Sequence, residues 1–172
     1  MSELAEFIDR ISSLSFFEVW ASIHGSLAML ALALFGGAIT LSYSLDKFAR
    51  AYQWLRNTLY WLAGTVVALD ALGLFIYRPY RESVPDSPRS ILKASEETSW
   101  LHGVVFEHKE MLAFAPMVML ITALMIVIYE GKSLKNNPVM KNAVRYLLIT
   151  SLVFVLVVAA EAVLVTKAAP LK

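Results

Sequence analysis

The chain contains no cysteine among its 172 residues. This absence excludes disulfide bonds, thiolate metal ligands, thiol nucleophiles and covalent attachment of a c-type haem. Any haem would therefore be held without a covalent link. The net charge of +1 includes no basic stripe of the kind that binds phosphate backbones, so we expect no nucleic-acid partner.

Charged residues are rare in four long apolar stretches. Hydrophobic residues make up 58% of the chain, and the mean hydropathy is +0.62. A helix of about 20 apolar residues crosses the ~30 Å hydrocarbon core of a bilayer. Residues 19–45, 57–77, 105–129 and 146–166 reach or approach this length. The sequence therefore predicts an all-α integral membrane protein, in which a four-transmembrane-helix bundle forms one membrane domain over residues 1–172.

The two short loops between these spans are basic, whereas the outer loop 78–104 and the N-terminal segment are not. The basic residues are Lys47, Arg50 and Arg56 in the first short loop and Lys132, Lys135, Lys141 and Arg145 in the second. Because Lys and Arg near span ends favour the cytoplasmic side, we expect both termini and the loop 78–104 outside. The membrane we expect is the cell membrane of a prokaryote.

The N-terminal segment is acidic and lacks the basic region that opens a secretory signal, so we expect it to stay in the mature protein. Leu4, Phe7, Ile8, Ile11 and Leu14 recur at helical spacing. This spacing predicts a short amphipathic helix over the first 16 residues, lying on the outer membrane surface.

Ionisable residues inside the spans fall at one depth. With a rise of about 1.5 Å per residue, His24, Asp70 and Glu161 lie within about 6 to 11 Å of the outer interface, and His108 joins them at the start of the third span. An ionisable side chain at such depth costs on the order of 2 to 3 kcal/mol unless it has a partner or a function. The sequence therefore predicts a polar layer to which every span contributes one residue.

Two histidines on neighbouring spans are able to supply both axial ligands of a haem b. His24 and His108 lie on the first and third spans, which run in the same direction, and small residues beside His24 would leave room for a flat macrocycle. His102 is the alternative to His108, which we favour because it lies deeper. Asp70 and Glu161, with Glu107 and Glu110 nearby, would then tune the haem or carry protons.

Other interpretations of the same residues stay open. The histidines and carboxylates would also suit a structural layer in which they pair between helices. A non-haem metal held by imidazole and carboxylate ligands is another possibility, although no paired ExxH pattern is present. A fourth interpretation makes Asp70 and Glu161 a proton relay or ion-binding pair without any metal.

The stretch IHGSLAMLALALFGGAITLSYS, which begins at Ile23, resembles the first haem-ligating helix of the cytochrome b-561 superfamily. In that family a four-helix core carries two haems, ligated by histidines of helices one with three and two with four. His24 with His102 or His108 matches the first pair, but the second and fourth spans contain no histidine. The resemblance therefore implies a single-haem relative.

These observations predict an integral membrane b-type cytochrome, an electron-transfer or quinone-linked subunit with one haem near the outer face. Such a chain could serve a membrane oxidoreductase and would meet lipid, a quinone, and other membrane subunits or further copies of itself. The alternatives are a non-catalytic accessory subunit of a larger membrane complex and a non-haem metal or proton-binding membrane protein.

Overall fold

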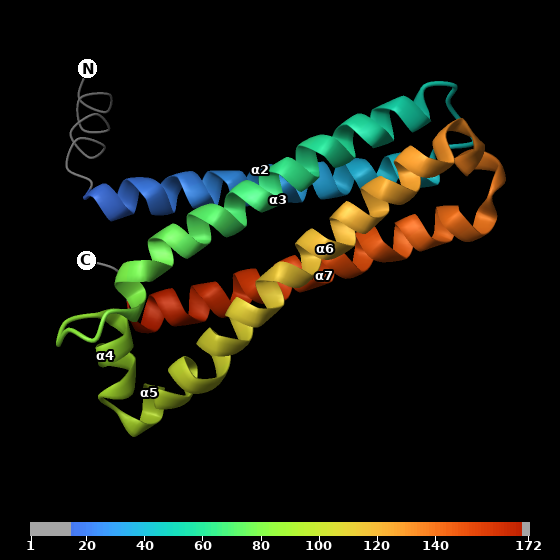
Figure 1. Cartoon of the computed structure of the whole chain (residues 1–172). Helices are drawn as coiled ribbons and strands as arrows, with labels where there is room; N and C mark the ends of the chain where they lie inside the picture. The colour runs from blue at the N-terminus through green and yellow to red at the C-terminus, as the bar shows by residue number, and fades with distance from the viewer. Residues whose placement is uncertain (1–14, 170–172) are drawn as a thin grey trace, which may run out of the picture.

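Four long helices form the body of the protein, as the apolar stretches predict (Figure 1). The computed structural model describes residues 15–169. The long helices are α2 (Phe16–Tyr43), α3 (Ala51–Arg81), α6 (Glu107–Glu130) and α7 (Pro138–Ala168). With the turns that extend α6, all four are long and apolar enough to cross a membrane. These helices confirm the predicted all-α architecture. It suits a membrane, because a helix satisfies its own backbone hydrogen bonds where no water is present.

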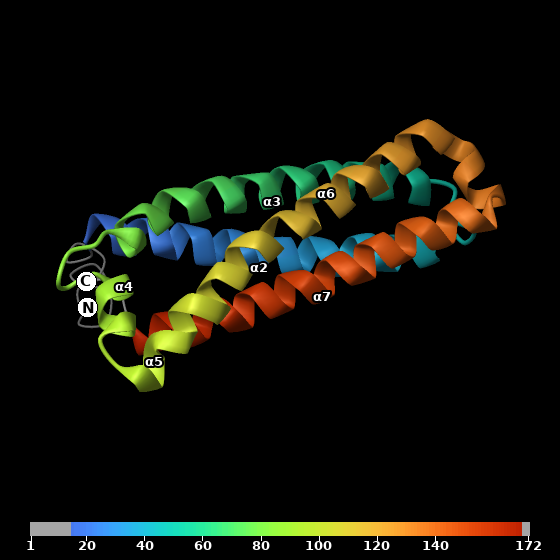
Figure 2. The same cartoon turned by 60° about the horizontal axis from the view of Figure 1, so that its bottom comes forward.

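The helices form two antiparallel hairpins, α2 with α3 and α6 with α7, which pack through α3 against α6 and α2 against α7 (Figures 1 and 2). The turn after α2 and the 3₁₀ segment η2 (Gly131–Asn136) meet at one end, called here the short-loop end. At the opposite end α2 begins and α7 ends. We call this the cavity end, because the largest of the cavities described below extends toward it.

Local sequence signals fix where the helices begin and end. Ser15 Oγ accepts the Glu18 N–H at 3.3 Å while the Glu18 carboxylate accepts the Ser15 N–H at 2.7 Å, a reciprocal cap that starts α2. Asn137 caps α7 ahead of Pro138. Gly131 ends α6 at a φ of +57°, a conformation that favours glycine.

The helices continue past the predicted spans, and most of the loop 78–104 is helical. Helix α3 continues to Arg81, and α4 (Pro88–Lys93), α5 (Glu96–Trp100) and the π-helical segment η1 (Leu101–Phe106) lead into α6. Charged residues end an apolar run without ending a helix, because their side chains reach water while the backbone bonds continue. The predicted N-terminal amphipathic helix falls almost entirely on residues outside the described range.

Two apolar clusters hold the bundle together and leave a stretch between them. The larger cluster includes Phe35, Leu59, Leu120 and Leu148 and extends to the short-loop end. The smaller one, around Phe106, lies at the cavity end. Between the clusters, α3 has no fully buried residue from 67 to 79 and α7 has none from 152 to 164. The polar residues lie at this level.

Two buried serines of the bundle differ in whether their hydroxyls are paired. Ser42 Oγ donates to the Ile39 carbonyl at 2.6 Å, whereas Ser151 Oγ has no hydrogen-bond partner among residues 15–169. Removing a buried unpaired hydroxyl relieves a desolvation cost of roughly 1 kcal/mol, while removing a paired one loses a bond of similar strength. We expect Ser151→Ala to raise the free energy of unfolding and Ser42→Ala to lower it.

Unfolding in mixed micelles with rising sodium dodecyl sulfate, followed by far-UV circular dichroism, measures both variants. A loss of stability in Ser151→Ala equal to that in Ser42→Ala would contradict the assignment of the Ser151 hydroxyl as unpaired.

Candidate functional site

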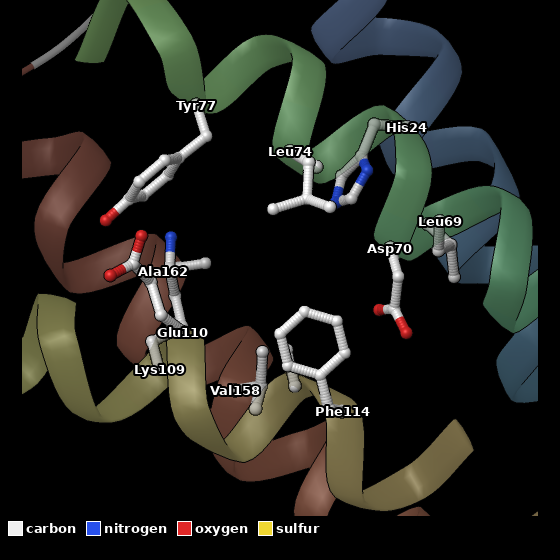
Figure 3. A pocket seen from close by; sticks show the side chains of 12 residues that line it. His24, Leu69, Asp70, Leu74, Tyr77, Lys109, Glu110, Phe114, Val158 and Ala162 are labelled. Atoms are coloured by element: carbon white, nitrogen blue, oxygen red, sulfur yellow. The ribbon is translucent and has the colours of Figure 1, made fainter. Parts of the chain in front are cut away.

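A cavity lies between the two apolar clusters, and all four long helices contribute to its wall (Figure 3). Its polar lining residues are His24 from α2, Asp70 and Tyr77 from α3, and Lys109 and Glu110 from α6. Helix α7 contributes Val158 and Ala162. The volume of this part is about 150 Å³. The cavity is therefore lined mostly by apolar atoms, with a few ionisable side chains among them.

Two further cavities adjoin the first, and His24 borders all three. One of about 580 Å³ extends toward the cavity end, past Phe106 to Glu18 and Lys167. Another of about 120 Å³ lies beside Ala31, Val66 and Pro116. His24 is therefore the ionisable side chain that the three cavities share.

The ring of His24 lies opposite a glycine of α3. A Cβ atom added to Gly73 would lie 3.6 Å from His24 Cε1, an ordinary van der Waals contact, so alanine would fit there against the ring. The ring is half-buried, and its Nδ1 atom is buried without a hydrogen-bond partner among residues 15–169. Buried nitrogens without partners are uncommon, and the same side chain lines all three cavities, so His24 is a candidate ligand-binding residue.

Asp70 lies on the same side of the cavity as His24, one helix turn before Gly73 (Figure 3). Its side chain is half-buried, and Oδ2 has no hydrogen-bond partner among the described residues. No hydrogen bond joins it to His24 within residues 15–169. The carboxyl group is therefore available to a ligand or to a proton.

Lys109 enters the cavity from α6, where its ammonium lies over two aromatic rings. Its Nζ atom is 5.2 Å from the Phe106 ring centre and 5.9 Å from that of Tyr77. Phe106 and Tyr77 stack at 4.6 Å with an interplanar angle of 15°. Cation–π contacts of this kind hold an ammonium where water is scarce. The Glu110 carboxylate instead pairs with the Arg81 guanidinium beside Tyr77.

His108 takes part in a different contact. Its Nδ1 atom lies 2.6 Å from Glu161 Oε1, which joins α6 to α7, and its side chain is 54% exposed. Met111, one turn along the same face of α6, is 80% exposed. The face of α6 that carries His108 therefore points away from the bundle interior, and Lys109 on the next face points into it.

His102 lies in the π-helical segment and packs against Phe106, with ring centres 5.3 Å apart. The residue is 7% exposed, and neither ring nitrogen has a hydrogen-bond partner among residues 15–169. Phe106 separates it from the cavity, since Phe106 lines the larger chamber and His102 lines none of the three.

The structure thus brings some of the predicted residues together and leaves others apart. His24, Asp70 and Glu110 share one cavity, whereas His108 pairs with Glu161 and Glu107 is exposed. Neither His108 nor His102 lines the cavities that His24 borders. The pairing of His24 with one of them as axial ligands stays a prediction. Within residues 15–169, no three His, Asp or Glu side chains are placed to hold a metal ion together.

Sequence reasoning did not find Lys109 or Gly73, which shape the cavity. Lys109 stands between His108 and Glu110 in a charged run at the start of the third span, a position typical of a span end rather than of a polar layer. Gly73 lies in an apolar span where a glycine has no distinctive neighbours in the sequence. Its spacing of three residues from Asp70, on one helical face, is the signal that could have found it.

No family model, curated protein or solved structure matches this chain. The fold and the site define an all-α membrane protein with four spans and a polar cavity at one end of the bundle.

The two histidines near the cavity should differ in their effect on stability. We expect His108→Ala to lower the free energy of unfolding by roughly 0.5–2 kcal/mol, because the Glu161 carboxylate, 17% exposed, loses its partner. His24→Ala should cost less, since it breaks no hydrogen bond at Nδ1. His108→Gln, which keeps a donor, is the matched control. Thermal unfolding in detergent gives the order, and a larger loss in His24→Ala would show that His24 has a structural partner.

Proposed function

We propose that the protein is an integral membrane b-type haem protein that transfers electrons, with one haem bound in the cavity beside His24. One observation carries the proposal: the His24 imidazole lies at the wall of a chamber inside an apolar helical bundle. Imidazole from a transmembrane helix is a common axial ligand of haem b.

The residues around His24 suit a large, flat, amphiphilic ligand with acidic groups. The chamber of about 580 Å³ lies within the range of roughly 300–1,000 Å³ typical of cofactor pockets. Gly73 lines the chamber beside the His24 ring without a side chain of its own, and Tyr77 and Phe106 supply flat apolar walls. Lys109 and Lys167 border the chamber and would pair with carboxylates of the ligand. Haem bound here would supply one-electron oxidation and reduction.

In this arrangement His24 is the axial ligand that the chain offers from the cavity wall. His108 would need α6 to turn and its bond to Glu161 to break before it reached the same chamber. His24 would therefore hold the haem from the cavity wall, and His108, the partner that the sequence predicts for it, would stay paired with Glu161.

The electron partners follow from the expected orientation. The basic residues of the two short loops favour the cytoplasmic side for the short-loop end, and the cavity end would then face outward. Electrons would then pass to another membrane subunit or to a quinone near the outer surface. Asp70, whose Oδ2 atom has no described partner, would take up or release the accompanying proton at the cavity wall.

A second candidate function is a non-catalytic accessory subunit of a membrane complex. The pairs of His108 with Glu161 and of Arg81 with Glu110 favour it, because each links two helices at the level of the polar layer. In that case the polar layer would be structural and the protein would hold no haem.

A reduced-minus-oxidised visible spectrum of the full chain, expressed with a haem precursor and purified in detergent, tests the proposal. We expect a haem signal that His24→Ala abolishes and that Gly73→Leu lowers at least several-fold, because a leucine there would meet the His24 ring. Gly64→Leu is the matched control on the same helix, since a Cβ there has no neighbour within 4 Å. Circular dichroism confirms that each variant is folded.

A second measurement tests whether His24 holds the haem without His108. The reduced protein should bind carbon monoxide with a shift of the Soret band, and His108→Ala should keep its haem. Haem loss in both His24→Ala and His108→Ala would restore the two-histidine pair. A colourless protein without extractable haem would overturn the proposal and leave the accessory-subunit function.

A further inference from the structure

A second polar pocket lies at the short-loop end, far along the bundle from His24. The turn after α2 and the 3₁₀ segment η2 meet there (Figure 1). The pocket has a volume of about 180 Å³. Its lining residues are Leu45, Asp46, Lys47, Phe48, Ala49, Tyr52, Lys132 and Lys135.

This pocket carries positive charge that the protein itself does not neutralise. Lys47, Lys132 and Lys135 form no ion pair within residues 15–169. The one carboxylate in the lining, that of Asp46, is already bound by Lys141, whose Nζ atom lies 3.2 and 2.9 Å from its two oxygens. Three ammonium groups from two different hairpins therefore face one small pocket without a counter-ion.

The pocket also has an apolar side that belongs at a membrane surface. Leu45 is buried, Tyr52 is half-buried and the Phe48 side chain is 56% exposed. Tyr43 and Trp54, at the neighbouring helix ends, are each 51% exposed. Aromatic side chains at span ends prefer the headgroup level of the bilayer, so the pocket opens where lipid phosphates lie.

We propose that this pocket binds the phosphate group of an anionic phospholipid, with Lys47, Lys132 and Lys135 as its cationic ligands and Phe48 and Tyr52 against the adjoining glycerol and acyl region. Basic pockets between transmembrane helices are suited to such headgroups. A free phosphate ion would meet the same ammonium groups but would leave the apolar wall unused. Because Lys47 comes from one hairpin and the other two lysines from the second, the bound lipid would also tie the hairpins together.

Thermal unfolding of the purified full chain in a zwitterionic detergent tests this proposal, with dioleoylphosphatidylglycerol, dioleoylphosphatidylcholine or inorganic phosphate added in separate titrations. Lys132→Gln/Lys135→Gln is the test variant, since neither lysine makes a hydrogen bond or ion pair within the described residues. Arg78→Gln/Lys93→Gln removes the same charge from exposed positions near the cavity end and is the control.

We expect phosphatidylglycerol, but not phosphatidylcholine, to raise the unfolding temperature of the unchanged protein and of the control variant. In the test variant the apparent affinity for phosphatidylglycerol should fall about tenfold or more, because each lysine near the surface contributes about 1 kcal/mol to the attraction of an anionic lipid. Equal loss in both variants would overturn the proposal in favour of general charge attraction. Equal stabilisation by inorganic phosphate would also overturn it, because the site would then take the ion rather than the lipid. None of these outcomes depends on what binds beside His24.

Discussion

The absence of water from the hydrocarbon core of a bilayer is the constraint on which this structure depends. Backbone groups there must pair within the chain, so the four apolar stretches become helices. Polar side chains at the same depth must find partners or line a cavity. His108 pairs with Glu161, and Arg81 pairs with Glu110. His24, Asp70 and Lys109 instead line a cavity.

Packing decides where the cavity lies. Phe35 and the leucines of α3 fill the interior toward the short-loop end, and the stack of Tyr77, Phe106 and Tyr80 lies toward the other end. The Tyr80 hydroxyl donates to the Ala169 carbonyl at 2.5 Å, which ties α3 to the end of α7 and so fixes this stack. The helices between these two contacts keep His24 and Lys109 facing a shared space.

The fold and the depth of the polar residues could be predicted from the sequence, because both depend on composition along the chain. Spans follow from apolar length, and His24 and Asp70 follow from counting residues inward from the span ends. The rotation of α6 could not be predicted. A π-helical segment before it changes which residues face inward, so Phe106 and Lys109 meet the cavity and His108 does not.

Only part of the helix outside the hydrocarbon could be predicted from the sequence. Hydropathy falls at Arg78, yet α3 continues to Arg81. The portion of the outer loop from Ile91 to Trp100 allows a surface helix, and α4 and α5 cover most of it. The role of Gly73 is also hard to predict from the sequence, since it depends on the His24 ring, which approaches from another helix.

The measurement that tests the account most directly is thiol labelling of single cysteines in a chain that has none of its own. Ala162→Cys places a thiol in the cavity wall, whereas Leu164→Cys lies nearer the end of α7 but faces outward from the bundle, 52% exposed. In membranes, a small charged thiol reagent added from the outer side should label Ala162→Cys faster than Leu164→Cys. Faster labelling of Leu164→Cys, or no labelling of Ala162→Cys, would contradict a polar cavity that opens at this end of the bundle.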